Sequence, residues 1–387
     1  MILAPPDVVT ETLVAHIREL VECESPSADH AAVARSADVV AALGERLLGA
    51  APERIVLDGV THLRWRLGGQ TPETQAPVTR TRVLVLAHHD TVWPVGTLER
   101  LPFAVRDGIL TGPGCFDMKA GLAMALHAVA ALDDRDGVTL LVTGDEELGS
   151  PSSRTLIEDS ARGARAALVL EASADGGALK LERKGVSLYE VVVDGLAAHA
   201  GLEPEKGVNA TVELAHEVLA VAGLADPAVG TSVTPTVAGS GSTTNTVPAR
   251  ASFWVDVRAR TALEQERVDA ALRALVPVTP GARVTVHGGI NRPPLEAAAS
   301  AGLFSRAQAL AARLGLEPLT GVAVGGASDG NFTAGIGVPT LDGLGAVGGG
   351  AHADHEHVLI ADLVPRTLLL AALVADLATA EPGKEPS

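Results

Sequence analysis

Short apolar runs alternate with amphipathic stretches along most of the chain. Apolar runs of this length are typical of buried parallel strands, and three of them end abruptly in acids or histidines. These are VLVLAHHD (83–90), VTLLVTGDEE (138–147) and RAALVLEAS (165–173). In open α/β sheets, ligands bind beyond the carboxyl ends of the strands. The three strands are therefore predicted to bring a histidine and several carboxylates to one edge of one sheet.

The rest of this pattern predicts an α/β domain in which helices flank a mixed, mostly parallel sheet. TPETQAP (71–77) is polar and rich in Pro and Thr, and is expected to form a turn. Apolar periodicity places helices at 8–22, 31–50, 118–132, 151–161, 299–314 and 361–380. It places strands at 54–58, 62–67, 82–88, 138–143, 166–170, 319–324 and 338–342.

The pattern changes after residue 182. Strands are expected at 188–195, 231–240, 249–259 and 282–289, with helices at 207–222 and 261–275. This order matches the ferredoxin-like split βαβ arrangement. We therefore expect an inserted α+β domain at 183–291, a catalytic domain in two parts at 1–182 and 292–380, and a disordered tail at 381–387.

Composition narrows the class of protein. A formal net charge of −17 and only 2% aromatic residues argue against nucleic acid and anionic membranes as partners. The N-terminus lacks the features of a signal peptide, and we find no apolar run near the length of a membrane span. Cys23 and Cys115 form no CxxC pair, which excludes a zinc-thiolate site. A disulfide between them stays open, but a cytoplasmic enzyme fits the sequence best.

His88 and Asp90 occupy alternate positions at the end of a strand, so their side chains point the same way and that of His89 points the other way. A lone strand-end histidine is more often structural. A ligating imidazole, however, commonly gives its other N–H to a carboxylate. We assign His88 as a metal ligand and Asp90 as its orienting partner.

Asp117 lies in a Gly/Pro loop, GPGCFDMKAG (112–121), just before a helix. Its simplest role is that of a helix N-cap. The tight GPG backbone could instead direct the carboxylate toward the strand ends, where one carboxylate can bridge two metals. The loop lacks the G-x-G-x-x-G spacing of a dinucleotide site.

Asp145, Glu146 and Glu147 gather three acids at a strand terminus, which could also be a solvated turn. Two adjacent glutamates suit a division of roles in which one ligates a metal and the other activates water. In GAHADHEHV (350–358), His352 is our choice of ligand because it follows the flexible GGGA.

A rival chemistry is a serine nucleophile. GASDG (326–330) fits the nucleophile-elbow pattern around Ser328, and Asp354 and His357 follow in a permissible order. That reading leaves the acids and His88 at the other strand ends unexplained.

With these residues placed, the chain resembles the zinc-dependent exopeptidase and deacylase family, which includes glutamate carboxypeptidase, acetylornithine deacetylase, succinyl-diaminopimelate desuccinylase and aminoacylase. The resemblance is greatest to bacterial glutamate carboxypeptidase, through AHHDTVWPVGTLERLPF (87–103), and it covers about 10–378. The SDGNF segment (328–332) also resembles a family loop, which discounts the serine nucleophile. Five motifs occur in the family's order: AHHDTV (87–92), GPGCFDMKAG (112–121), TGDEELGS (143–150), AAHAG (197–201) and GGGAH (348–352).

The resemblance implies two zinc ions per subunit, with cobalt or manganese as possible substitutes because the ligands are nitrogen and oxygen. His88, Asp117 and Glu171 would hold one ion, and Glu147, Asp117 and His352 the other. The resemblance also implies that Glu146 is the general base and that Asp90 is the partner of His88. His199 would come from the second subunit of a dimer and polarise the scissile carbonyl. Asn245 and Arg292 would bind the substrate carboxylate.

The expected function is that of a di-zinc amidohydrolase that cleaves an amide or peptide bond next to a free carboxylate. A glutamate carboxypeptidase-like activity is the first expectation. An N-acyl amino acid deacylase or a dipeptidase is the alternative within the family. A non-catalytic small-molecule-binding protein that keeps the fold is the alternative from another class.

Overall fold

The computed structural model describes residues 10–68 and 81–379. The expected turn at 71–77 and tail at 381–387 lie outside these residues. The chain divides into two compact units. The first holds the described residues up to Glu182, Ala297–Val324, and those from Ser328 onward; the second holds Arg183–Glu296 and Gly325–Ala327. The second unit thus extends beyond residue 291, the predicted end of the insert.

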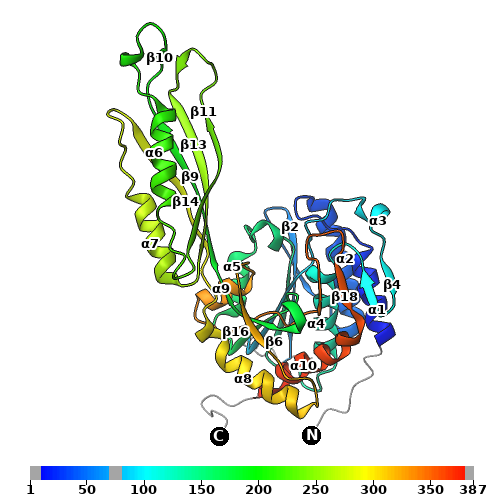
Figure 1. The fold of residues 1–387 in the computed structure, drawn as a ribbon. Helices are drawn as coiled ribbons and strands as arrows, with labels where there is room; N and C mark the ends of the chain where they lie inside the picture. Colours follow the sequence, from blue (N-terminus) through cyan, green and yellow to red (C-terminus); the bar gives the residue numbers. More distant parts are fainter. Residues whose placement is uncertain (1–9, 69–80, 380–387) are drawn as a thin grey trace. The chain divides into compact units, whose positions relative to one another are not determined.

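The first unit contains a sheet of six strands in its described part, in the order β1-β2-β6-β3-β7-β16 (Figure 1). β6, β3, β7 and β16 run parallel, while β1 and β2 form an antiparallel edge. The predicted mixed, mostly parallel sheet is confirmed. The strand bounds are β1 Glu53–Leu57, β2 Val60–Leu67, β3 Val83–His88, β6 Val138–Thr143, β7 Ala166–Val169 and β16 Thr340–Leu341.

The central strands are apolar throughout because both faces of the sheet are covered. On β3, Val83 and Val85 face one core, and Leu84 and Leu86 face another. The first core includes residues of α1 (Thr10–Val21), α2 (His30–Leu48), α4 (Ala120–Ala130), α8 (Ala297–Arg313) and α10 (Ile360–Thr379). The second includes residues of α5 (Arg154–Ala161) and α9 (Gly330–Gly335).

Some short elements of the first unit differ from the prediction. The strand expected at 319–324 is present as β15 (Gly321–Val324), but it lies outside the main sheet and pairs with β8 (Leu179–Arg183), which was not predicted. The backbone of Asp117 and Met118 is not helical, so the regular helix begins later than expected, with α4 at Ala120. A further sheet has the strand order β17-β18-β5-β4. Its strands are β17 Gly348–Gly349, β18 His357–Leu359, β5 Ile109–Thr111 and β4 Ala104–Arg106. The short helix α3 spans Thr97–Arg100.

The second unit has the predicted ferredoxin-like arrangement, with an antiparallel sheet in the order β11-β13-β9-β14. Figure 1 shows α6 and α7 on one face of this sheet. Its strands are β9 Gly185–Asp194, β11 Ser232–Ser240, β13 Arg250–Ala259 and β14 Arg283–Arg292; its helices are α6 Ala210–Ala222 and α7 Ala262–Arg273. Beyond the sheet, β10 (Ala198–His199) pairs with β12 (Thr246–Val247).

In the described part of the chain, every helix is too short or too polar to cross a membrane.

Candidate metal centre

The sheet order brings the predicted strand ends together. β3 lies between β6 and β7 and runs parallel to both, so the carboxyl ends of all three meet at one edge. His88 is the last residue of β3, Glu146 and Glu147 follow β6, and Glu171 follows β7. The geometry expected from the apolar runs is therefore present.

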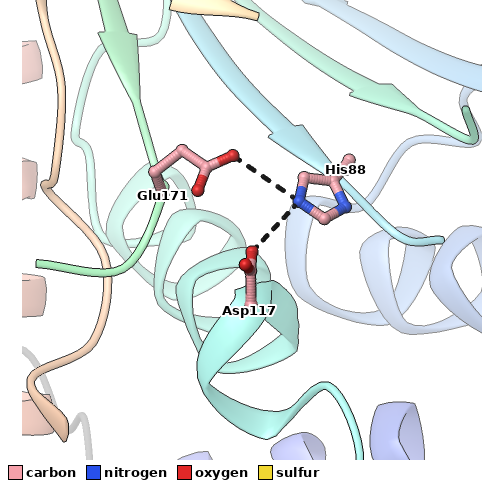
Figure 2. A group of neighbouring side chains, drawn as sticks. All are labelled: His88, Asp117 and Glu171. Atoms are coloured by element: carbon pink, nitrogen blue, oxygen red, sulfur yellow. Dashed lines mark ion pairs between the residues drawn. The ribbon is translucent and has the colours of Figure 1, made fainter. Parts of the chain in front are cut away.

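His88, Asp117 and Glu171 form the first of two ligand groups found among the described residues (Figure 2). His88 Nε2 lies 3.4 Å from Asp117 Oδ1 and 3.6 Å from Glu171 Oε1. The histidine is buried, and its Nε2 has no hydrogen-bond partner among the described residues. A buried ring nitrogen aimed at two carboxylates, at more than hydrogen-bonding distance, is what a shared cation requires.

Asp117, Glu147 and His352 form the second group. His352 Nε2 lies 3.4 Å from Asp117 Oδ2 and 3.1 Å from Glu147 Oε2. Asp117 thus presents one carboxylate oxygen to each group. Donors at about 2.0–2.2 Å from a tetrahedral zinc lie about 3.3–3.6 Å from one another. Three of the observed spacings fall in this range, and the fourth, 3.1 Å between His352 and Glu147, lies just below it.

Charge in this cluster also favours cations. The carboxylates of Asp117 and Glu147 raise the pKa of His352 to about 10. Burial lowers the pKa of His88, but interactions with Asp117, Asp90 and Glu171 outweigh burial and leave it well above its ordinary value. The negative field that favours a proton on these rings also favours a divalent cation in its place.

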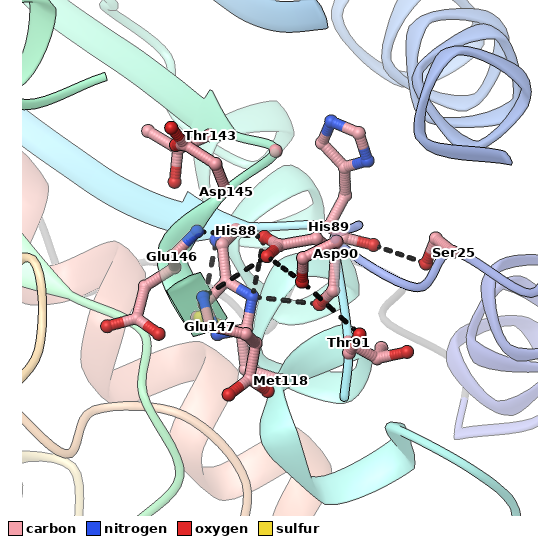
Figure 3. A network of polar contacts seen from close by, with 12 residues as sticks. Ser25, His88, His89, Asp90, Thr91, Met118, Thr143, Asp145, Glu146 and Glu147 are labelled. Atoms are coloured by element: carbon pink, nitrogen blue, oxygen red, sulfur yellow. Dashed lines mark hydrogen bonds and ion pairs between the residues drawn. The ribbon is translucent and has the colours of Figure 1, made fainter. Parts of the chain in front are cut away.

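Asp90 orients two parts of the cluster. His88 Nδ1 lies 3.0 Å from the backbone oxygen of Asp90 and 3.4 Å from its Oδ1. The backbone N–H groups of Glu146 and Glu147 each donate to the Asp90 carboxylate at 3.2 Å (Figure 3). Ser27, which the sequence analysis missed, donates to the same carboxylate at 2.6 Å. Asp90 therefore fixes both the ring of His88 and the backbone that carries the two glutamates.

The loop that carries Asp117 depends on close backbone approaches. Gly114 has φ +70°, and a Cβ there would lie 2.5 Å from Thr91 Cγ2. Gly121 in α4 allows that helix to approach the chain just before Glu171, since a Cβ would lie 2.2 Å from Leu170 O. The N-cap alternative for Asp117 is not supported: Lys119 occupies the N-cap position of α4, and both Asp117 oxygens face histidines.

Neighbouring residues with similar chemistry have other roles. Asp145 accepts hydrogen bonds from the backbone and hydroxyl groups of Ser152 and Ser153, so it holds the turn after β6. The ring of His89 points away from the glutamates (Figure 3). Its ring nitrogens contact Ser36 Oγ and Thr61 O, and burial lowers its pKa to about 4.

Ser328, Asp354 and His357 do not form a catalytic triad in the part of the chain that the structure describes. Ser328 is buried and donates to Asp342 Oδ2 at 2.6 Å. Asp354 pairs with Arg100, and His357 Nδ1 contacts the backbone oxygen of His355. Within the described residues, the three proposed triad members therefore have separate partners.

His199, Asn245 and Arg292 belong to the second unit. The segments of His199 and Asn245 are adjacent, because β10 pairs with β12 and Ala200 N donates to Asn245 O at 2.9 Å. Arg292 pairs instead with Val186, near the start of β9, whereas β10 follows the end of β9. Within one chain, the sheet therefore separates Arg292 from the other two.

Comparison with known proteins extends over most of the chain. The model of peptidase family M20/M25/M40 matches residues 84–376. The chain is 35% identical over 312 residues to carboxypeptidase G2 of Pseudomonas sp. strain RS-16, a match that spans 76% of this chain and 74% of the relative. It is 30% identical over 310 residues to succinyl-diaminopimelate desuccinylase of Methylorubrum extorquens strain PA1, with 73% and 79% of the two chains covered. An M20 family metallo-carboxypeptidase from Sulfolobus solfataricus has a similar fold, with a TM-score of 0.71, 18% identity, and 97% and 100% coverage.

Proposed function

The chain belongs to peptidase family M20/M25/M40 and is a metal-dependent hydrolase of C–N bonds, and on that premise we propose that it cleaves an amide or peptide bond next to a free carboxylate. The observation that carries the proposal is the orientation of Asp117, whose two oxygens face two separate ligand groups. The identity to carboxypeptidase G2 supports a glutamate carboxypeptidase-like activity first. The match to a desuccinylase supports the alternative, an N-acyl amino acid deacylase or dipeptidase.

Two zinc ions fit the donors of this centre. His88, Asp117 and Glu171 would hold one ion, and Glu147, Asp117 and His352 the other. Imidazole and carboxylate donors without thiolate also suit cobalt and manganese. When bound, such ions polarise a carbonyl and lower the pKa of water.

Glu146 is the proposed general base. It follows β6 beside Glu147, and its backbone N–H is held by Asp90. In the proposed reaction, its carboxylate takes a proton from the attacking water and passes it to the nitrogen of the leaving amine. Glu147 is directed instead toward His352 and serves as a ligand. These intact groups argue against a non-catalytic binding protein.

His199 is the proposed donor to the substrate carbonyl. Its Nδ1 accepts hydrogen bonds from the backbone of Gly201 and Leu202, both at 3.1 Å, so a neutral ring carries its proton on Nε2. That exposed N–H can stabilise negative charge developing on a carbonyl oxygen.

A homodimer would bring the second-unit residues to one substrate. Arg292 lies far from His199 and Asn245 along the sheet, so we propose that His199 and Asn245 come from one subunit and Arg292 from the other. Arg292 would bind the substrate carboxylate through its guanidinium. Mixing inactive His199→Ala and Glu146→Ala proteins under subunit exchange should restore part of the activity. A mixture that stays inactive despite proven exchange would contradict a role for His199 across subunits.

The function is tested by a hydrolysis screen of folates, N-acyl amino acids and dipeptides with zinc-, cobalt- and manganese-loaded protein. We expect the highest kcat/KM on a substrate with a C-terminal glutamate. Chelation should abolish turnover, and added metal should restore it. Full activity after chelation, together with inactivation by a serine-directed phosphonate, would contradict the proposal. A cytoplasmic location is also proposed, because Cys23 and Cys115 are both free thiols.

A further inference from the structure

Glu356 is a buried carboxylate beside the metal centre that the sequence analysis did not single out. It is 3% exposed, and each of its oxygens accepts two hydrogen bonds. Oε1 accepts from the backbone N–H groups of Phe116 and Asp117, at 2.9 and 3.0 Å. Oε2 accepts from the backbone N–H of Gly114 and from Trp93 Nε1, both at 2.8 Å.

Three of these four donors belong to the short loop that carries Asp117. Charge-assisted hydrogen bonds of this kind are stronger than neutral ones, so together they fix the loop against Glu356. The N–H of Asp117 itself is one of the donors. Because its backbone is held, the carboxylate is directed away from Glu356, toward His88 and His352.

The strand framework places Glu356 between two ligand-bearing segments. Glu356 immediately precedes β18, which pairs with β17 on one side and β5 on the other. β17 leads into the turn that carries His352, and β5 leads into the loop that carries Asp117. Glu356 is therefore anchored where the two segments meet.

We propose that Glu356 is a positioning residue that holds Asp117 so that its two oxygens face the two ligand groups. The inference rests on the proposed function through the bridging role of Asp117. Residues that orient metal ligands usually contribute about 10–100-fold to metal affinity. A carboxylate that only stabilised the fold would contribute to thermal stability and leave the affinity for metal unchanged.

The test compares Glu356→Gln with Asp354→Asn in the full-length protein. The glutamine keeps one acceptor oxygen, but its NH₂ group faces two former donors, either the N–H groups of Phe116 and Asp117 or those of Gly114 and Trp93. Asp354 is on the same turn and carries the same charge, but it is exposed and paired with Arg100. Zinc dissociation constants would be measured by competition with a chromophoric chelator, and folding of the zinc-free proteins by circular dichroism.

We expect Glu356→Gln to bind zinc about 10–100-fold more weakly, and Asp354→Asn to stay within about threefold of wild type, as for a surface ion pair. Amide exchange of the peptide that contains residues 114–117 should be faster in Glu356→Gln without zinc. If the glutamine variant does not fold, Glu356→Asp keeps the charge and both oxygens on a side chain one methylene shorter, and should also weaken zinc binding.

Wild-type affinity in a folded Glu356 variant would overturn the positioning role, even with faster amide exchange. An equal loss in Asp354→Asn would overturn it too, because the effect would then be one of charge alone. If the wild type binds two zinc ions and either of these results is found, only the positioning role is overturned and the proposed function stands. A wild type that binds no zinc would overturn both proposals.

Discussion

Buried and partly buried acids occur in both units of this protein, and their charge is compensated in different ways. In the first unit, Asp117, Glu147 and Glu171 surround the ring nitrogens of His88 and His352 at 3.1–3.6 Å. In the second unit, Glu213 and Glu217 lie buried one turn apart on α6. Within the described residues, no metal-ligand group includes this second pair.

The negative charge of the pair on α6 is compensated by backbone N–H groups and by a proton. Glu213 accepts from the N–H groups of Val278 and Thr279, at 2.8 and 2.6 Å, which keeps its pKa low despite burial. Burial and the neighbouring Glu213 raise the pKa of Glu217 to about 7. Buried acids alone therefore do not indicate a metal centre. A metal centre is indicated when histidine nitrogens also lie at the distances from the carboxylates that a shared cation would set.

Removal of the shared carboxylate should have the largest effect. Asp117→Ala takes one donor from each ligand group, so we expect loss of both metals. Because the base then has no activated water to act on, kcat/KM should fall by more than about 10⁴-fold, the upper end for loss of a general base alone. Metal analysis and kinetics check this, with the exposed Asp133→Ala as the control. Retention of two metals in Asp117→Ala would show that neither group depends on this bridge.

The adjacent glutamates should separate catalysis from metal binding. Glu146→Ala should keep both metals and lose about 10²–10⁴-fold in kcat. Glu147→Ala should lose the metal of the second group, because Glu147 Oε2 lies 3.1 Å from His352 Nε2. Metal content and kcat would be measured on the same preparations. Equal metal loss in both variants would refute the division of roles.

The two ligand groups should differ in occupancy when the exposed histidine is removed. The side chain of His352 is 50% exposed, whereas that of His88 is 1% exposed. His352→Ala should therefore reduce the metal content from two to one and leave the buried group occupied. His355 is on the same turn but belongs to neither ligand group, so the control variant His355→Ala should keep both metals. Complete metal loss in His352→Ala would mean that the groups fill only together.

The smallest effect is expected at the acid pair of α6, and it depends on pH. The folded protein holds the Glu217 proton up to about pH 7, while an unfolded glutamate loses it near 4.5. This group therefore lowers the free energy of unfolding as the pH rises from 4.5 to 7. Glu217→Gln should gain about 1–3 kcal/mol relative to wild type across that range. Urea unfolding at several pH values tests this, with exposed Glu266→Gln as the control. A difference that does not change with pH would contradict the shared proton.

The main sheet could be predicted because burial on both faces leaves a readable pattern. Val83–His88 is apolar up to its last residue, so the chemistry at its end stands out. The sheet of β4, β5, β17 and β18 could not be predicted in the same way. Its strands have two or three residues, too few for periodicity, and their pairing joins segments far apart in sequence.

The same limit applies to the supporting residues of the site. His88 and Asp90 are two positions apart, so their relation is visible in the sequence. Glu356 lies about 240 positions from its donors Gly114 and Asp117, and in sequence it is only an acid within a histidine-rich turn. The roles proposed for His199, Asn245 and Arg292 require a second subunit, and only the resemblance to the family, not the pattern of this chain, suggests them.

The central claim is that Asp117 joins two cation sites. Anomalous diffraction from crystals of the zinc-loaded protein, recorded on both sides of the zinc absorption edge, tests it most directly. We predict two zinc peaks per subunit, one within bonding distance of Asp117 Oδ1, His88 and Glu171, and the other within bonding distance of Asp117 Oδ2, Glu147 and His352. A single peak, or two peaks of which only one contacts Asp117, would contradict the account.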